Sequence, residues 1–207
     1  MMYDTCIFDL YGTLVDIRTD EAAPGLWKNL ALFYSYYGAS WKPEELKNAY
    51  ERLTLSMSEG CRGLRGDSHE AFPEIRIEDV FRKLFHEKGT EADDALITHA
   101  GQFFRILSTR RLRLYEGTAD MLSAVRSAGK KLYLLSNAQR IFTRYEMCSL
   151  GITSYFDGIY ISSEHGYLPG GASAGRRPCA GAYGYETHIG DPYLLIFMYP
   201  SYSPGVK

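Results

Sequence analysis

A short apolar run near the N-terminus ends on an aspartate and then breaks at once into a turn. The run is Tyr3–Phe8, the carboxylate is Asp9, and the letters YGT occupy positions 11–13. An apolar run of this length next to a glycine is typical of a buried strand. Such a strand gains no stability from an ionised group at its end. The pattern therefore predicts that Asp9 has a role other than packing.

The later half of the chain alternates strand and helix signals. Residues 131–135, KLYLL, predict a strand that stops at Ser136 and Asn137, and Gly158–Ile161 predicts another. Helical spacing of apolar residues is found before and between them, around 121–125 and 142–148. Strands and helices that alternate with short links favour a parallel sheet.

Between these two parts the sequence predicts only helices. Four apolar series at helical spacing follow one another from about residue 19 to residue 108, with no strand signal among them. The helical stretch interrupts the strand–helix unit after its first strand. We therefore expect a discontinuous core of residues 1–18 and 110–207 and an inserted helical domain of residues 19–109.

Composition narrows the class of protein. Of 207 residues, 45% are apolar and 23% charged, as in ordinary globular proteins, and the net charge is -2. This charge gives no general case for a nucleic-acid or anionic-membrane partner. The apolar run 194–199 is too short to span a bilayer, and the N-terminus lacks the positive region of a signal peptide. The four cysteines have neither disulfide density nor CxxC spacing. We expect a cytoplasmic protein that acts on a small molecule.

Two polar side chains are predicted to meet at one edge of the sheet. Asp9 ends the first strand and Ser136 ends a later one. Ligands of open parallel sheets bind beyond the carboxyl ends of the strands, so both side chains should face the same crevice. Gly12 permits a tight turn, and Thr13 and nearby backbone amides could orient the carboxylate or bind an anion. This set suits a phosphoryl group, with Asp9 as nucleophile.

The same segments resemble the haloacid dehalogenase (HAD) superfamily. FDLYGTLVD resembles its motif I, LYLLSNAQR its motif II, and LGITSYFDGIYISSEHGY the segment that leads to motif III. The helices between motifs I and II resemble a C1-type cap. The resemblance covers about residues 1–167. It implies an α/β fold, with a Rossmann-like parallel-sheet core and an inserted all-helical cap.

The resemblance also implies roles for individual residues. Asp9 matches the nucleophile, and Ser136 matches the hydroxyl that hydrogen-bonds the transferring group. Substrate or phosphate binding would involve the motif I residues Tyr11, Gly12 and Thr13 and the motif II residue Asn137. The implied cofactor is Mg²⁺, held by the Asp9 carboxylate, the backbone carbonyl of Tyr11, and Asp191 in a faint echo of motif IV.

Tyr11 departs from the phosphatases of the family. Their residue at this place is usually an aspartate that serves as general acid and base. A tyrosine with a pKa of about 10 donates a proton poorly to a leaving alkoxide at pH 7. The D-x-Y-G-T-L form is also seen in the 2-haloacid dehalogenases of the family, which expel a halide that needs no proton.

The C-terminal part departs further. Motif III of the family is a lysine, yet no lysine lies between Lys131 and Lys207. Arg176 and Arg177 could supply the charge, but they lie too close to Asp191 for the helix and strand that the family places between motifs III and IV. The apolar residues of 168–207 show neither helical nor strand spacing, apart from a possible strand at 193–199. A frameshifted or truncated gene would produce such a tail, and we expect residues 168–184 to form irregular coil.

Three functions follow from these observations. The first expectation is a phosphate-monoester hydrolase that acts through an aspartyl-enzyme intermediate and is impaired by the missing lysine. The first alternative is a metal-independent 2-haloacid dehalogenase that also starts from Asp9. The second alternative belongs to another class: a catalytically dead HAD-like binding module or a defective gene product.

Overall fold

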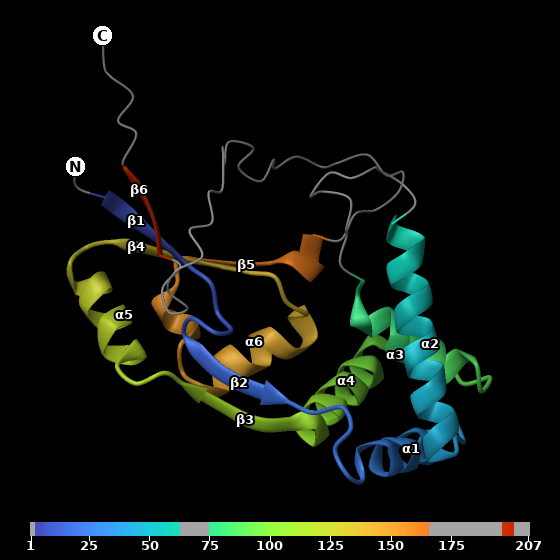
Figure 1. Cartoon of the computed structure of the whole chain (residues 1–207). Helices are drawn as coiled ribbons and strands as arrows, with labels where there is room; N and C mark the ends of the chain where they lie inside the picture. The colour runs from blue at the N-terminus through green and yellow to red at the C-terminus, as the bar shows by residue number, and fades with distance from the viewer. Residues whose placement is uncertain (1–2, 63–74, 166–195, 201–207) are drawn as a thin grey trace.

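The computed structural model describes residues 3–62, 75–165 and 196–200 (Figure 1). Its central sheet has four strands in the order β5-β4-β1-β6. The bounds are β1 Tyr3–Phe8, β4 Lys131–Ser136, β5 Gly158–Ile161 and β6 Ile196–Pro200. The first three are parallel to one another, as the sequence predicts, and the fold is α/β.

β6 differs from its neighbours because it runs antiparallel to β1. The sequence predicted a possible strand at 193–199 without a direction, within a core expected to be parallel. An antiparallel neighbour needs only an extended segment along a free strand edge, whereas a parallel neighbour needs a crossover connection. The sheet is therefore mixed, with the antiparallel strand at its edge.

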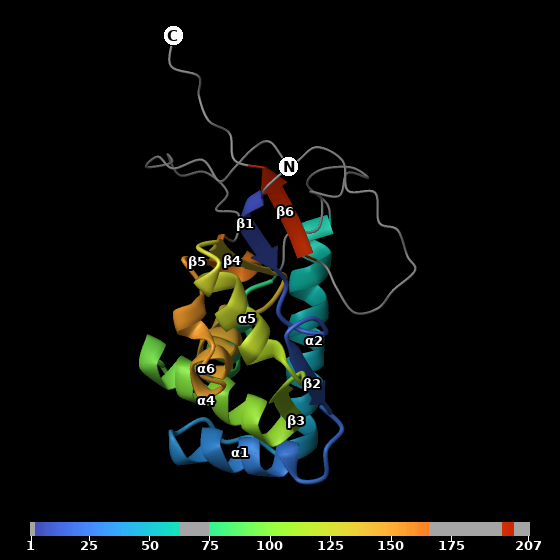
Figure 2. The ribbon, with the colours of Figure 1, turned by 90° about the vertical axis from the view of Figure 1, so that its left-hand side faces the viewer.

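Two helices cover one face of this sheet. They are α5 Thr118–Ser127 and α6 Arg140–Ser149, and both views place them below the strands (Figures 1 and 2). Side chains of strands and helices share one buried apolar cluster, which includes Phe8, Leu122, Leu132, Leu134 and Met147. Alternate residues of β4 point into this cluster, as expected for a strand with one covered face.

A second, two-stranded antiparallel sheet joins the core to the helical stretch. β2 Val15–Thr19 pairs with β3 Thr109–Leu114. The sequence analysis did not predict these strands. The side chain of Asp16 on β2 forms ion pairs with Arg111 (3.2 Å) and Arg113 (2.9 Å) on β3, which ties the two strands together across their exposed face.

Between β2 and β3 the described residues form four α-helices, which we call the helical block. They are α1 Leu26–Tyr36, α2 Pro43–Arg62, α3 Ile77–His86 and α4 Asp94–Ser108. The block has its own apolar cluster, built around side chains such as Tyr34, Phe81 and Phe85. Both views place α1 at the opposite end of the molecule from β6.

The helical block packs directly on the core. Ile141 and Phe142 of α6 belong to the apolar cluster of the block. Gly101 of α4 lies so close to Ile141 that a Cβ placed there would meet its Cδ1 at 2.5 Å. The division into a cap of residues 19–109 and a core therefore stays a prediction, because apolar packing continues from one part into the other. Within the described residues, no helix is long and apolar enough to cross a membrane.

Candidate active site

Asp9 lies at the end of β1, beside the end of β4. Phe8 pairs with Leu134, so the two strands end at the same edge of the sheet. The hydroxyls of Ser136 and Thr13 and the backbone N–H of Leu10 lie close enough to the Asp9 carboxylate to lower its pKa. Burial nevertheless raises the pKa of Asp9, because the lost hydration outweighs the effect of these three groups. The structure thus brings Asp9, Thr13 and Ser136 together.

The turn after Asp9 depends on Gly12. Its φ of 83° lies in the left-handed region, which glycine adopts without strain. The carbonyl of Leu10 accepts hydrogen bonds from the N–H groups of Thr13 (3.3 Å), Leu14 (2.8 Å) and Val15 (2.9 Å). The N–H of Gly12 donates to the carbonyl of Val15 at 2.9 Å. These four amides have hydrogen-bond partners inside the turn. Binding of an anion or substrate by Gly12 and Thr13 stays a prediction.

The loop after β4 is held by the segment after β5. The backbone N–H of Ala138 donates to Oγ of Ser162 at 3.0 Å, and that of Arg140 donates to Oγ of Ser163 at 2.7 Å. Ser136 is buried at the start of this loop, and Asn137 beside it is exposed. Binding of substrate by Asn137 stays a prediction.

Tyr11 points its hydroxyl at α6. The hydroxyl donates a hydrogen bond to Oε2 of Glu146 and lies 3.2 Å from Oγ1 of Thr143. Burial raises the pKa of Tyr11, and the negative charge of Glu146 raises it further. At neutral pH the hydroxyl therefore stays protonated and donates its hydrogen bond to Glu146.

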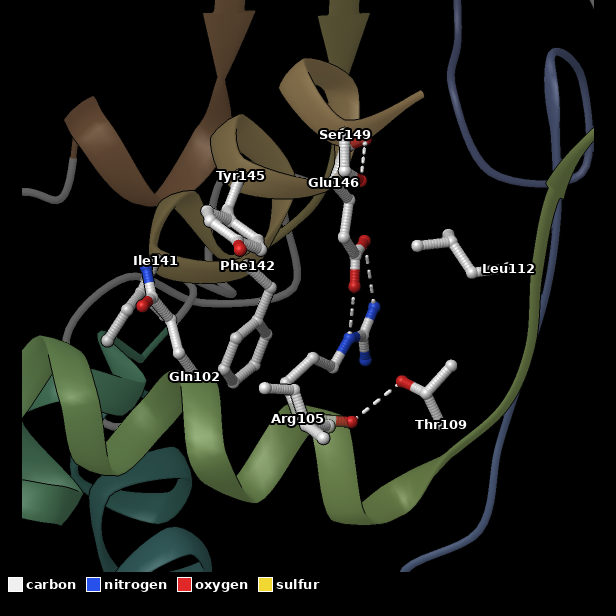
Figure 3. A pocket seen from close by; sticks show the side chains of 10 residues that line it. Gln102, Arg105, Thr109, Leu112, Ile141, Phe142, Tyr145, Glu146 and Ser149 are labelled. Atoms are coloured by element: carbon white, nitrogen blue, oxygen red, sulfur yellow. Dashed lines mark hydrogen bonds and ion pairs between the residues drawn. The ribbon is translucent and has the colours of Figure 1, made fainter. Parts of the chain in front are cut away.

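Glu146 also pairs with Arg105 of α4, as the close view shows (Figure 3). The Nε–Oε1 distance is 2.6 Å, and the side chain of Glu146 is 5% exposed. The guanidinium carbon of Arg105 lies 4.9 Å from the ring centre of Phe142 and 5.9 Å from that of Tyr11. Sequence reasoning missed this pair. The feature of the sequence that could have revealed it is Glu146, a charged residue four positions after Phe142 on the buried face of the predicted helix.

A cavity of about 300 Å³ lies next to this ion pair, between α4, β3 and α6. Arg105 and Glu146 line it together with Gln102, Leu112 and Phe142. Asp9, Thr13 and Ser136 are not among its lining residues. The cavity is therefore separate from the predicted catalytic group.

Magnesium ligands are only partly accounted for. Within residues 3–62, 75–165 and 196–200, no group of three or more His, Cys, Asp or Glu side chains could hold a metal ion. Of the three ligands expected from sequence, Asp9 and Tyr11 lie in the described part, and Tyr11 would contribute only its backbone carbonyl. Asp191, Arg176 and Arg177 lie outside the described residues, as does the coil predicted for 168–184.

A model of the haloacid dehalogenase-like hydrolase family matches residues 3–176. The chain belongs to this family of HAD-like hydrolases. The match includes both strand ends that carry Asp9 and Ser136, and it agrees with the resemblance seen in motifs I and II. A comparison with curated proteins finds no significant match.

Several solved structures resemble this HAD-like chain. The L-2-haloacid dehalogenase from Xanthobacter autotrophicus is 20% identical over 79% of this chain and 58% of its own, with a TM-score of 0.34. The HAD-hydrolase YfnB from Bacillus subtilis, bound to magnesium, is 18% identical over 79% of this chain and 67% of its own (TM-score 0.39). A predicted phosphoglycolate phosphatase from Haemophilus somnus is 17% identical over 77% of this chain and 63% of its own (TM-score 0.34). At these identities and TM-scores, none of the three identifies the substrate.

Proposed function

We propose that this chain is a hydrolase in which Asp9 attacks a small substrate whose leaving group needs no proton, as in a 2-haloacid. One observation carries the choice: the hydroxyl of Tyr11, at the place where the phosphatases of the family have their acid, is committed to Glu146. When Asp9 attacks a phosphate monoester, the P–O bond to the alcohol breaks and the alcohol departs as an alkoxide, which requires a proton donor at that place. A halide leaves as a stable anion and requires none.

The reaction would proceed in two steps. An Asp9 carboxylate oxygen attacks the halogen-bearing carbon, the carbon–halogen bond breaks, and the halide departs with the bonding electron pair. The product is an ester between Asp9 and the substrate. Water then adds to the carbonyl carbon of this ester, which releases the hydroxy acid and a proton and restores the carboxylate. The hydroxyls of Ser136 and Thr13 hold the carboxylate in place for the first step.

Hydrolysis of a phosphate monoester is the second candidate. It is favoured by the same two hydroxyls, because Ser136 and Thr13 beside Asp9 suit the oxygens of a phosphoryl group as well. Bound Mg²⁺ would neutralise charge on the phosphate, with the Asp9 carboxylate and the Tyr11 carbonyl as ligands. These two groups fit a hard cation, but they are an incomplete set without an acid such as Asp191.

A chelator separates the two candidates. Release of halide from a 2-haloacid that persists in excess EDTA and disappears in Asp9→Asn is the expected result. Release of phosphate from an aryl phosphate that EDTA abolishes would favour the second candidate. Release of neither, from a folded protein, would identify the chain as the catalytically dead form.

A further inference from the structure

Three separate segments meet at one buried carboxylate. Glu146 of α6 is buried, and its two oxygens accept hydrogen bonds from Arg105 and Tyr11. Oε1 accepts from Nε of Arg105, in the last turn of α4, at 2.6 Å. Oε2 accepts from the Tyr11 hydroxyl and lies 3.4 Å from Nη2 of Arg105. The helical block, the core helix and the turn after β1 are thus joined at a single residue.

Stability alone is a weak reason for this arrangement. Removing two charges from water costs about as much as their attraction returns, and apolar residues of similar volume would often hold the helices together equally well. A carboxylate with directed hydrogen bonds does something that apolar contact cannot, because it fixes where its partners point. The partner that matters is Tyr11, since only Leu10 separates it from Asp9.

The turn after β1 links the position of Tyr11 to that of Asp9 and Thr13. Leu10 is fully buried, and its carbonyl accepts three amides of the turn that ends with Val15. Thr13, whose hydroxyl contacts Asp9, lies inside this turn. A shift of the Tyr11 ring would therefore move both the carboxylate and one of its hydrogen-bond donors.

A second path reaches the loop after β4. Thr143 is fully buried beside the Tyr11 hydroxyl, and its Oγ1 donates to the carbonyl of Gln139 at 2.9 Å. The Gln139 side chain in turn donates to the carbonyl of Ile75 (2.8 Å) and accepts from the N–H of Ile77 (3.0 Å), at the start of α3. The helical block is tied at two places to the loops that carry Asp9 and Ser136.

We propose that Glu146 is a positioning residue: it fixes Tyr11, and thereby the turn that carries Asp9 and Thr13, relative to the helical block through Arg105. The inference rests on the proposed function, because it gives Asp9 the reacting carboxylate. It adds that the placement of the helical block and the geometry of the nucleophile are coupled.

Kinetics of Glu146→Gln, Tyr11→Phe and the double variant test the coupling. Tyr11→Phe removes one hydroxyl and leaves the ion pair intact. Each single change should lower kcat about tenfold to a hundredfold with KM nearly unchanged, since a hydrogen bond to a charged group is lost. The double variant should be no slower than the slower single variant, because both changes break one contact. The matched control is Glu87→Gln, which changes the exposed ion pair with Arg52 (2.7 Å) inside the helical block and should leave kcat unchanged.

A measurement that does not depend on enzyme activity separates the positioning role of Glu146 from the proposed function. Backbone amide NMR signals of Gly12 and Thr13 should shift in Glu146→Gln and in Tyr11→Phe, and stay in place in Glu87→Gln. Unmoved signals in the first two variants would overturn the positioning role, even if the chain is an active hydrolase. Shifted signals in a chain without hydrolase activity would support positioning and refute the proposed function. If Glu146→Gln does not fold, Tyr11→Phe decides by the same two readouts.

Discussion

The Tyr11 hydroxyl and the Glu146 carboxylate are hydrogen-bonded to each other although they stand 135 positions apart in the chain. This contact directs the residue two places after Asp9 toward α6. A side chain held in this way is a poor proton donor to a leaving group. The substrate class that we propose, one that expels a stable anion, rests on this geometry, and so does the role proposed for Glu146.

The pH dependence of turnover should reflect the burial of Asp9. Attack requires the ionised carboxylate, and burial raises its pKa above the usual value of about 3.9. The acid limb of kcat/KM should therefore lie at a higher pH than for an ordinary aspartate. A pH–rate profile from about pH 3 to pH 8 measures this. A limb at or below the usual aspartate pKa would contradict the assignment.

Stability should change in opposite directions at two aspartates. Because the pKa of Asp9 is raised in the folded state, its ionisation lowers stability as the pH rises through the window between the unfolded and folded pKa values. Asp9→Asn should therefore raise Tm at pH 7, and the gain should vanish below the unfolded pKa.

Asp16 is the matched control for this effect. Hydrogen bonds from Arg113 and then Arg111 lower its pKa, so its ionised form favours the folded state above the unfolded pKa. Asp16→Asn should not raise Tm at pH 7. Thermal unfolding of both variants at pH 7 and pH 3.5 makes the comparison. A lower Tm for Asp9→Asn than for the wild type at pH 7 would count against the account.

Removal of Arg105 should be costly. Arg105→Met leaves the buried Glu146 without its cation and should destabilise the fold by about 3 kcal/mol. Adding Glu146→Leu removes the stranded charge and should restore most of that loss. Urea unfolding measures both. Arg52→Met, in the exposed pair with Glu87, should cost less than about 1 kcal/mol. Equal losses of unfolding free energy for Arg105→Met and Arg52→Met would show that the buried ion pair contributes no more to stability than the exposed one.

Gly12 should matter for activity as well as for stability. Its φ of 83° disfavours any side chain, although no atom lies within 4 Å of an added Cβ. Gly12→Ala should therefore cost about 1 kcal/mol or more through backbone strain alone. Gly129→Ala, at φ 72° and equally open, should have a similar cost. Only Gly12→Ala should lower kcat, because only Gly12 lies in the turn beside Asp9. Equal activity of the two variants would refute that link.

The strand ends and the helices could be predicted from sequence because they follow from local pattern. Apolar runs that stop at Asp9 and Ser136 mark the two strands, and helical spacing marks the helices. β2 and β3 were missed although side chains of β2 alternate, as in Val15, Asp16 and Ile17. The two strands pair across about 95 positions of the chain, and no local pattern encodes that pairing. The Arg105–Glu146 pair could not be predicted. It depends on how α4 packs against α6, and no local pattern encodes that packing.

The rate should be low even if the chemistry is as proposed. The family places a lysine near the nucleophile, and none lies between Lys131 and Lys207. Two anions about 4 Å apart repel by roughly 4 kcal/mol at an effective dielectric constant near 20, so the loss should slow turnover by orders of magnitude. We expect kcat below the usual range of about 1–10³ s⁻¹. A kcat inside that range would mean that another cation, such as Arg176 or Arg177, replaces the lysine.

The role of Asp9 as nucleophile is best tested by halide release from a 2-chloroacid, measured for the wild-type chain and for Asp9→Asn, each in excess EDTA. We expect slow chloride release by the wild type, no release above background by Asp9→Asn, and no effect of EDTA. Equal rates for the two proteins would contradict the claim that Asp9 is the nucleophile.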